Sequence, residues 1–249
     1  MEPVYRTIIG LARTVFFAQG LKFTVTGAEH IPARGGAVLA INHTGYLDFT
    51  YAGLPARRVK RYVRFMAKKE VFDNAISGPI MRALKHIPVD RVAGADSYLA
   101  AVEYLKRGEL VGVYPEATIS RSFEIKQFKS GAARMAIEAD VPIIPVVIWG
   151  AQRVWTKGHP KRLGRTNTPI SIAVGEPIAP NLPPAELTEL LHSTMQRLLA
   201  GLQENYAHEP GAYWVPARLG GSAPTLAEAD ALDAAEIAER HAKRAAAGD

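Results

Sequence analysis

Residues 37–48 read AVLAINHTGYLD, and this sequence carries the strongest indication of the fold class. Its first part, Ala37–Ile41, is a continuous apolar run of strand length that ends at the polar Asn42. Such a run is typical of a strand buried on both faces, as in a parallel sheet. The pattern predicts a helix at Leu47–Ala56, directly after the polar cluster. A buried strand, a polar loop and a helix form the repeating unit of an α/β layer fold.

Outward from this unit, short apolar runs alternate with helical stretches along the chain. We predict further strands at Arg61–Ala67, Leu110–Tyr114, Ile143–Ile148 and Pro169–Val174, and helices at Ser77–Lys85, Ala95–Arg107, Gly131–Ala139 and Pro183–Tyr206. This alternation predicts an α/β fold with a single mixed or parallel sheet flanked by helices. The length of 249 residues fits one domain with additions. We therefore expect a helical segment at residues 1–20, one folded domain at residues 21–208 and a tail at residues 209–249.

The tail has a different composition from the rest of the chain. Pro and Gly residues interrupt it up to Pro224, and an Ala-rich stretch with mixed charges follows from Thr225 to Asp249. Such a stretch is either a solvent-exposed helix or a partly disordered segment. We expect no chemistry there.

Positive charge is concentrated in the first third of the chain. Residues 1–90 hold 13 Lys and Arg against 6 Asp and Glu, a net charge of +7, whereas the whole chain carries +6. This distribution indicates an anionic partner, such as phospholipid headgroups, a phosphorylated substrate or nucleic acid. Nucleic acid is disfavoured, because the basic run at residues 57–69 has only Tyr62 and Phe65 as aromatic neighbours and no recognition motif accompanies it. The chain has no Cys, which excludes disulfides, thiolate zinc sites and thiol nucleophiles.

Residues 3–20 predict an amphipathic helix, with a bulky apolar face opposite Arg6 and Arg13. One interpretation is a surface helix packed on the core. The other is a helix in the plane of a membrane interface, with its bulky face in the acyl boundary and its arginines near headgroups. No segment has the roughly 18 apolar residues that would span a bilayer. The predicted membrane contacts are Arg6, Arg13, Phe16, Phe17, Arg57, Arg58 and Arg61, although the last three could instead belong to a solvated basic face.

His43 and Asp48 are the candidate catalytic pair. They follow the carboxyl end of a predicted buried strand, where open α/β folds place their sites. Across a turn at Gly45, the carboxylate can accept a hydrogen bond from one imidazole nitrogen and leave the other free as a base. Spacing alone also allows a structural alternative, in which Asp48 caps the next helix and His43 is a satisfied polar group.

Three further blocks follow in order, namely KHIPVDR at residues 85–91, YPEAT at residues 114–118 with Arg121 beyond it, and VPIIPV at residues 141–146. Residues 42–48, NHTGYLD, are the first of these four blocks, which makes YPEAT the third. Taken in order, the four blocks resemble the 1-acylglycerol-3-phosphate acyltransferase family within the glycerolipid acyltransferases. That family carries Asn-His-x-x-x-x-Asp, a block ending in Arg, Phe-Pro-Glu-Gly-Thr-Arg and an apolar Val-Pro-Ile-x-Pro strand. One departure is that Ala117 stands where the family has Gly. A second is that two residues separate Thr118 from the Arg-Ser pair that begins at Arg121.

The resemblance implies transfer of a fatty acyl chain from acyl-CoA or acyl carrier protein to the sn-2 hydroxyl of lysophosphatidic acid, giving phosphatidic acid. It implies that His43 is the general base and that Asp48 orients it. The implied contacts to the acceptor phosphate and glycerol are Arg91, Glu116, Thr118, Arg121 and Lys129. For Glu116 a buried structural hydrogen bond is the alternative, and for Arg91 a surface ion pair with Asp90. No metal or other cofactor is expected.

We expect the protein to bind the cytoplasmic face of the cell membrane peripherally, on an anionic lipid surface. Two alternatives remain open, and the altered third block motivates the first of them. The acceptor could be another lysophospholipid or a glycolipid, or the protein could be a lipid-binding protein without catalysis.

Overall fold

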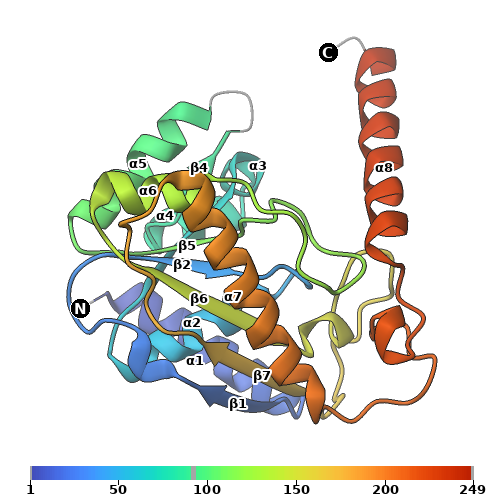
Figure 1. Cartoon of the computed structure of the whole chain (residues 1–249). Coiled ribbons are helices and arrows are strands. Elements are labelled where there is room, and N and C mark those ends of the chain that lie inside the picture. Colours follow the sequence, from blue (N-terminus) through green and yellow to red (C-terminus); the bar gives the residue numbers. More distant parts are fainter. Residues whose placement is uncertain (1, 91–93, 248–249) are drawn as a thin grey trace.

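The computed structural model describes residues 2–90 and 94–247, and a seven-stranded sheet forms its centre (Figure 1). The strands are β1 (Lys22–Thr26), β2 (Ala37–Ile41), β3 (Val63–Lys68), β4 (Ile87–Val89), β5 (Leu110–Val113), β6 (Ile143–Trp149) and β7 (Pro169–Val174). Their order in the sheet is β1-β7-β6-β2-β5-β3-β4. All neighbouring pairs are parallel except β6 and β7, which are antiparallel. The predicted mixed sheet in an α/β fold is confirmed.

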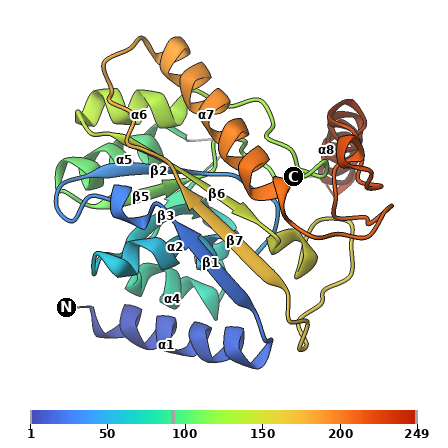
Figure 2. The same ribbon diagram turned by 60° about the horizontal axis from the view of Figure 1, so that its bottom comes forward.

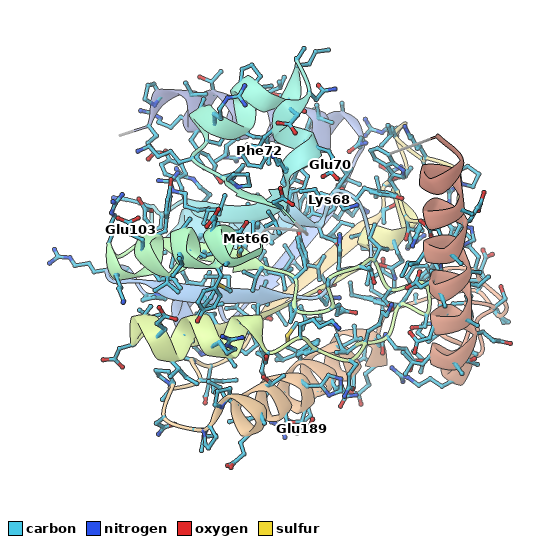
Figure 3. The ribbon with its side chains drawn as sticks, turned by 90° about the horizontal axis from the view of Figure 1, so that it is seen from above. Met66, Lys68, Glu70, Phe72, Glu103 and Glu189 are labelled. Atoms are coloured by element: carbon cyan, nitrogen blue, oxygen red, sulfur yellow. The ribbon has the colours of Figure 1, made fainter. Side chains whose placement is uncertain are left out.

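Helices cover both faces of the sheet. They are α1 (Pro3–Ala18), α2 (Asp48–Arg58), α3 (Lys69–Asp73), α4 (Ser77–Ala83), α5 (Gly94–Lys106), α6 (Gly131–Ala139), α7 (Pro184–Glu204) and α8 (Leu226–Ala247). Figure 2 shows α5, α6 and α7 on one face and α1, α2 and α4 on the other. Helix α8 stands apart at the edge of the molecule in all three views (Figure 3). The body is therefore a three-layer sandwich with one additional helix at its side.

Strand β2 lies in the middle of this sandwich and is buried on both faces. Val38 and Ala40 belong to the core under α5, α6 and α7, whereas Leu39 and Ile41 belong to the core under α1 and α2. The five residues of β2 are fully buried, as the continuous apolar run predicts. The strand therefore delivers the polar residues after Ile41 from a fixed position in the centre of the sheet.

Helix α1 packs on the sheet with part of its apolar surface. The Tyr5 hydroxyl donates to the Val63 carbonyl at 2.8 Å, and Phe16 contacts the rings of Phe23 and Tyr51 with centroids 5.2 and 5.3 Å away. Phe16 is buried, so its predicted membrane contact is wrong and it is a core residue. By contrast, Phe17 is 81% exposed. No helix among the described residues is long and apolar enough to cross a bilayer.

The structure contains two strands that the sequence pattern did not predict. It also shows that the tail forms a helix, which is one of the two alternatives given above. Strand β1 alternates between exposed and half-buried residues, and β4 has only three residues, including Pro88. In the tail, α8 begins with reciprocal hydrogen bonds. Glu228 Oε2 accepts the Thr225 N–H at 2.8 Å, and Thr225 Oγ1 accepts the Glu228 N–H at 3.3 Å. This is a capping box, which stabilises the helical alternative for the tail.

Candidate active site

The segment after β2 is fixed to the sheet by the side chain of Asn42. Its carboxamide is fully buried, donates to the Ile148 carbonyl at 3.0 Å and accepts the Ile148 N–H at 2.7 Å. Asn42 therefore extends the pairing of β2 with β6 through a side chain. This attachment holds His43, the next residue, at the carboxyl edge of the sheet.

His43 and Asp48 form an imidazole–carboxylate pair. The His43 Nδ1 lies 3.0 Å from Asp48 Oδ2, and the carboxyl group of Asp48 is fully buried. The same oxygen accepts the main-chain N–H groups of Thr44 at 2.7 Å and Gly45 at 2.8 Å. A carboxylate held by these donors can only accept, so the proton of the neutral imidazole resides on Nδ1 and Nε2 carries a free lone pair. The pair has the arrangement of a general base with its orienting acid.

The imidazole is held in place by packing as well. It stacks on the ring of Tyr114, with centroids 4.1 Å apart and an angle of 23° between the planes. Burial raises the pKa of Tyr114 well above its usual value, with a smaller contribution from the charge of Asp48. Tyr114 is therefore uncharged at physiological pH and provides a flat surface on which the imidazole packs. The His43 side chain remains 21% exposed, so the ring is reachable by a substrate.

Glu116 supports the backbone of this loop. Its Oε1 accepts the His43 N–H at 2.8 Å, and its Oε2 accepts the Lys126 N–H at 3.1 Å. Burial raises the pKa of Glu116 to about 8, although the bonds from His43 and Lys126 act in the opposite direction. Both carboxyl oxygens are thus engaged by protein backbone. The geometry matches the structural alternative for Glu116 rather than a contact to an acceptor hydroxyl.

The third block forms a loop that wraps around His43. Ala117 has φ of 61°, a left-handed conformation that favours Gly, which is the family's residue at this position. Ser120, one of the two additional residues, is buried and donates its N–H to the His43 carbonyl at 2.7 Å. The insertion therefore adds a second backbone tie to His43. Thr118 Oγ1 accepts a hydrogen bond from Lys126 Nζ at 3.1 Å.

Arg121, Lys126 and Lys157, which we call the cation cluster, lie together beside this loop. Arg121 Nε is 3.1 Å from Asp233 Oδ1 of α8, and its Nη2 is 2.8 Å from Glu236 Oε2. The predicted acceptor contact Arg121 is therefore paired with acidic side chains in this structure. The sequence patterns did not single out Lys126, Lys157 or Asp233, because no motif contains them and long loops separate them.

The remaining predicted acceptor contacts are not brought to His43 by described contacts. Arg91 lies outside the described residues. Lys129 is exposed, and its main-chain N–H is bonded to the Pro115 carbonyl at 2.9 Å. Lys68 ends β3 at the same carboxyl edge of the sheet as His43 (Figure 3). Within the described part of the chain, no group of three His, Asp or Glu side chains is arranged to hold a metal ion.

The predicted membrane contacts divide into two groups. Arg6, Arg13, Phe17 and Arg58 are exposed. Arg61 instead donates to the carbonyls of Pro32 at 3.0 Å and Gly35 at 2.6 Å, and also to Gly108. This guanidinium joins three loops, so its predicted role as a lipid contact is wrong. Arg57 is half-buried and lies over the Tyr62 ring at 4.7 Å.

Comparison with known proteins identifies the family of this chain. Residues 22–149 match the model of the family described as Acyltransferase. The chain is 30% identical over 158 residues to a 1-acyl-sn-glycerol-3-phosphate acyltransferase of Bacillus subtilis, a match that covers 62% of this chain and 72% of that protein. It is 30% identical over 161 residues to a protein of the same name from Limnanthes douglasii, covering 62% of this chain and 54% of that protein.

A solved structure has the same fold. The 1-acyl-sn-glycerophosphate (LPA) acyltransferase PlsC from Thermotoga maritima superposes with a TM-score of 0.66 at 24% sequence identity, covering 82% of this chain and 81% of that chain. The family match includes β1 to β6 and every residue from Asn42 to Lys129 discussed above. The chain belongs to the acyltransferase family.

Proposed function

We propose that the protein transfers an acyl chain from a thioester, acyl-CoA or acyl-ACP, to the sn-2 hydroxyl of lysophosphatidic acid. The observation that carries this proposal is the 3.0 Å contact between His43 Nδ1 and the buried Asp48, which leaves Nε2 as a base. The names of the Bacillus subtilis and Limnanthes douglasii relatives support lysophosphatidic acid as the acceptor. The choice between CoA and acyl carrier protein as the carrier is left to the assay.

The proton transfer follows from the pair. A free hydroxyl is a poor nucleophile at neutral pH, and His43 Nε2 removes its proton as the oxygen attacks, which is worth roughly 10²–10⁴ in rate. The imidazolium that forms is stabilised by Asp48, whose Oδ2 is kept in place by the N–H groups of Thr44 and Gly45. The stacked ring of Tyr114 limits rotation of the imidazole.

The acyl transfer is balanced without a covalent enzyme intermediate. The acceptor oxygen forms a bond to the thioester carbonyl carbon, and the carbon–sulfur bond then breaks as the tetrahedral adduct collapses. The thiolate leaves with the electron pair and takes the proton that His43 holds. The products are an oxygen ester and a free thiol, and His43 returns to its neutral form.

The test is an acceptor and donor panel with purified protein. Labelled acyl-CoA and acyl-ACP are each supplied with lysophosphatidic acid, other lysophospholipids, a glycolipid and monoacylglycerol. We expect lysophosphatidic acid to be preferred, and Asp48→Asn to lose most of the turnover. A lack of preference for lysophosphatidic acid would contradict the acceptor, and near-normal turnover in Asp48→Asn would contradict the orienting role.

A different acceptor is the second candidate, and the third block motivates it. Ala117 replaces a Gly, and Arg121 is engaged by Asp233 and Glu236. The same panel decides, because a lysophospholipid or glycolipid preferred over lysophosphatidic acid would select this candidate. A lipid-binding protein without catalysis would instead bind vesicles and show no turnover with any acceptor.

We also propose that the protein binds the cytoplasmic face of the membrane peripherally through α1. The helix exposes Leu11 and Phe17, at 62% and 81%, and it also exposes Arg6 and Arg13. Apolar side chains in the acyl boundary with arginines at the headgroups are the features of an interfacial helix. This placement would bring the lipid acceptor to the enzyme within the plane of the bilayer.

A further inference from the structure

Helix α8 is attached to the body mainly through charge. Among its side chains that the structure describes, only Ala229 and Asp233 are buried. Leu232 and Ile237 are about half exposed, at 46% and 49%. Figures 1 and 3 show the helix at the edge of the molecule, with the loops of the body facing one side of it. A helix held by ion pairs rather than by an apolar face can be displaced by an anion that binds the same cations.

The ion pairs of α8 converge on the cation cluster of Arg121, Lys126 and Lys157. Asp233 Oδ2 lies 2.6 Å from Lys126 Nζ, and Asp233 Oδ1 lies 2.9 Å from Lys157 Nζ and 3.1 Å from Arg121 Nε. Glu236 Oε2 lies 2.6 Å from Lys157 Nζ and 2.8 Å from Arg121 Nη2. Burial acts to raise the pKa of Asp233, but the hydrogen bonds and charges of Lys126 and Lys157 outweigh it and lower the pKa to about 2.

The three cations are themselves largely buried. Their side chains are 19%, 11% and 15% exposed for Arg121, Lys126 and Lys157. Buried charges of one sign are stable together only where an anion neutralises them. The cluster is therefore an anion site, and in this conformation two carboxylates of the same chain occupy it.

Each member of the cluster is tied to the catalytic loop by a neighbouring hydrogen bond. Arg121 follows Ser120, whose N–H bonds the His43 carbonyl at 2.7 Å. Lys157 follows Thr156, whose hydroxyl donates to the Thr44 carbonyl at 2.6 Å. Lys126 shares Glu116 with His43, as described above. The anion site is thus built on the same backbone that positions the base.

We propose that Arg121, Lys126 and Lys157 bind the phosphomonoester of the acceptor, and that Asp233 and Glu236 of α8 compete with it for this site. This inference rests on the proposed function, which supplies the phosphomonoester. The two carboxylates carry a combined charge of −2, which a phosphomonoester dianion replaces. A phosphate also offers three terminal oxygens to three cations, where Asp233 must share one oxygen between Arg121 and Lys157. Helix α8 is then a displaceable cover, released when the acceptor headgroup enters.

The first test measures the position of α8 in the full chain. Because the chain has no Cys, the pair Ala234→Cys on α8 and Ala200→Cys on α7 can carry spin labels without background. Both positions are exposed. We expect sn-glycerol 3-phosphate to shift or broaden the distance distribution at constant ionic strength, and glycerol to leave it unchanged. A distribution that glycerol 3-phosphate does not alter, at a concentration that saturates binding in calorimetry, would overturn the proposal.

The second test measures affinity by calorimetry. Asp233→Asn combined with Glu236→Gln should bind glycerol 3-phosphate about tenfold more tightly than the unaltered protein, because the competitor has lost its charge. Asp230→Asn is the matched control. Its carboxylate is 68% exposed and 3.7 Å from Lys126 Nζ, and its loss should change the affinity little. Lys157→Gln added to the double variant should weaken binding again, with circular dichroism showing that each variant is folded. Equal or weaker binding by the double variant would overturn the proposal.

Repeating the spin-label measurement with inorganic phosphate tests whether the site prefers the acceptor headgroup or free phosphate. Displacement of α8 at a lower concentration of glycerol 3-phosphate than of inorganic phosphate supports the acceptor headgroup. Equal or stronger action of inorganic phosphate would overturn that assignment. Neither test contains an acyl donor, so failure here is distinguishable from failure of the acceptor panel, which reports turnover.

Discussion

Glu116 Oε1 accepts the main-chain N–H of His43 at 2.8 Å, so a buried acid holds the backbone of the proposed base. Its other oxygen accepts the Lys126 N–H at 3.1 Å, which joins the base to the loop that bears the cation cluster. Both oxygens of the carboxyl group act as acceptors in this arrangement. A side chain of the same shape with only one acceptor oxygen therefore tests the arrangement.

Glu116→Gln should destabilise the protein by about 1–3 kcal/mol, because the amide places a donor against one of the two buried N–H groups. Its kcat should fall as well, since the His43 backbone loses its fixed position. Urea unfolding and turnover are measured on the same sample. The control is Glu103→Gln, which alters an exposed acid on α5 (Figure 3) that pairs with Arg107, and it should change stability by less than about 1 kcal/mol. Equal stability of Glu116→Gln and the unaltered protein would contradict the account.

The buried His86 should make the fold sensitive to acid. Burial, together with the charge of Arg64, lowers the pKa of His86 to about 4, and its Nδ1 accepts the Phe65 N–H at 3.1 Å as a neutral ring. The unfolded chain binds a proton near pH 6.5 and the folded chain near pH 4. The contribution of His86 to the free energy of unfolding is therefore fully present above pH 6.5. It is lost as the pH falls from 6.5 to 4, by up to about 3 kcal/mol.

Urea unfolding at pH 7 and pH 5 measures this loss. His86→Asn, whose carbonyl can accept the same N–H, should show a smaller decrease between the two pH values than the unaltered protein. His208→Asn, at an exposed position, should behave like the unaltered protein. If His86→Asn loses as much stability between pH 7 and pH 5 as the unaltered protein, groups other than His86 cause the acid sensitivity.

Ala117 should be a strained position. Its φ of 61° places the Cβ close to neighbouring backbone, a conformation that Gly adopts at no steric cost. We expect Ala117→Gly to stabilise the protein by up to about 1 kcal/mol in chemical unfolding, since relief of strain exceeds the entropy gained by the unfolded chain. Ala100→Gly inside α5 should destabilise by roughly 1 kcal/mol. If both substitutions destabilise equally, Ala117 is not strained.

The exposed side of α1 should carry membrane binding. Leu11→Ser combined with Phe17→Ser should weaken sedimentation with anionic vesicles by roughly tenfold or more, because two apolar side chains no longer enter the bilayer. The melting temperature should be unchanged, since both side chains are exposed. Leu99→Ser on α5, also exposed, is the control for loss of an apolar surface residue. If the double variant sediments with vesicles as well as Leu99→Ser does, α1 contributes to the packing of the core and not to membrane binding.

Much of the fold could be predicted from local patterns. The buried run Ala37–Ile41 became the doubly buried β2, and the predicted helix at Gly131–Ala139 has the same bounds in the structure. Strand β1 was missed although its residues KFTVT alternate strictly between polar and apolar, a pattern that could have identified the strand. Its pairing with β7, far along the chain, could not be predicted from a local pattern. Phe16 and Phe17 show a limit of local patterns. They are adjacent and identical in type, and only the packing of α1 on the sheet determines that Phe16 is buried and Phe17 exposed.

The site was predictable where one short segment contains it. His43 and Asp48 lie five residues apart, so the turn at Gly45 can bring them together, and the order of the four blocks favoured the catalytic interpretation that spacing alone left open. The cation cluster joins residues 121, 126 and 157 to Asp233, which lies 76 or more residues further along the chain, and only the tertiary fold brings these together. The composition of the tail gave no reason to expect Asp233 at the catalytic loop, because a single acid among many in an Ala-rich helix carries no pattern.

The most direct test of the central claim, that His43 is the base, is the turnover number of His43→Ala with saturating thioester donor and lysophosphatidic acid. Thermal unfolding and vesicle binding of the same preparation show that the fold and membrane attachment persist. If His43 is the base, kcat should fall by roughly 10²–10⁴ while both other measurements stay close to those of the unaltered protein. A kcat close to that of the unaltered protein would contradict this claim.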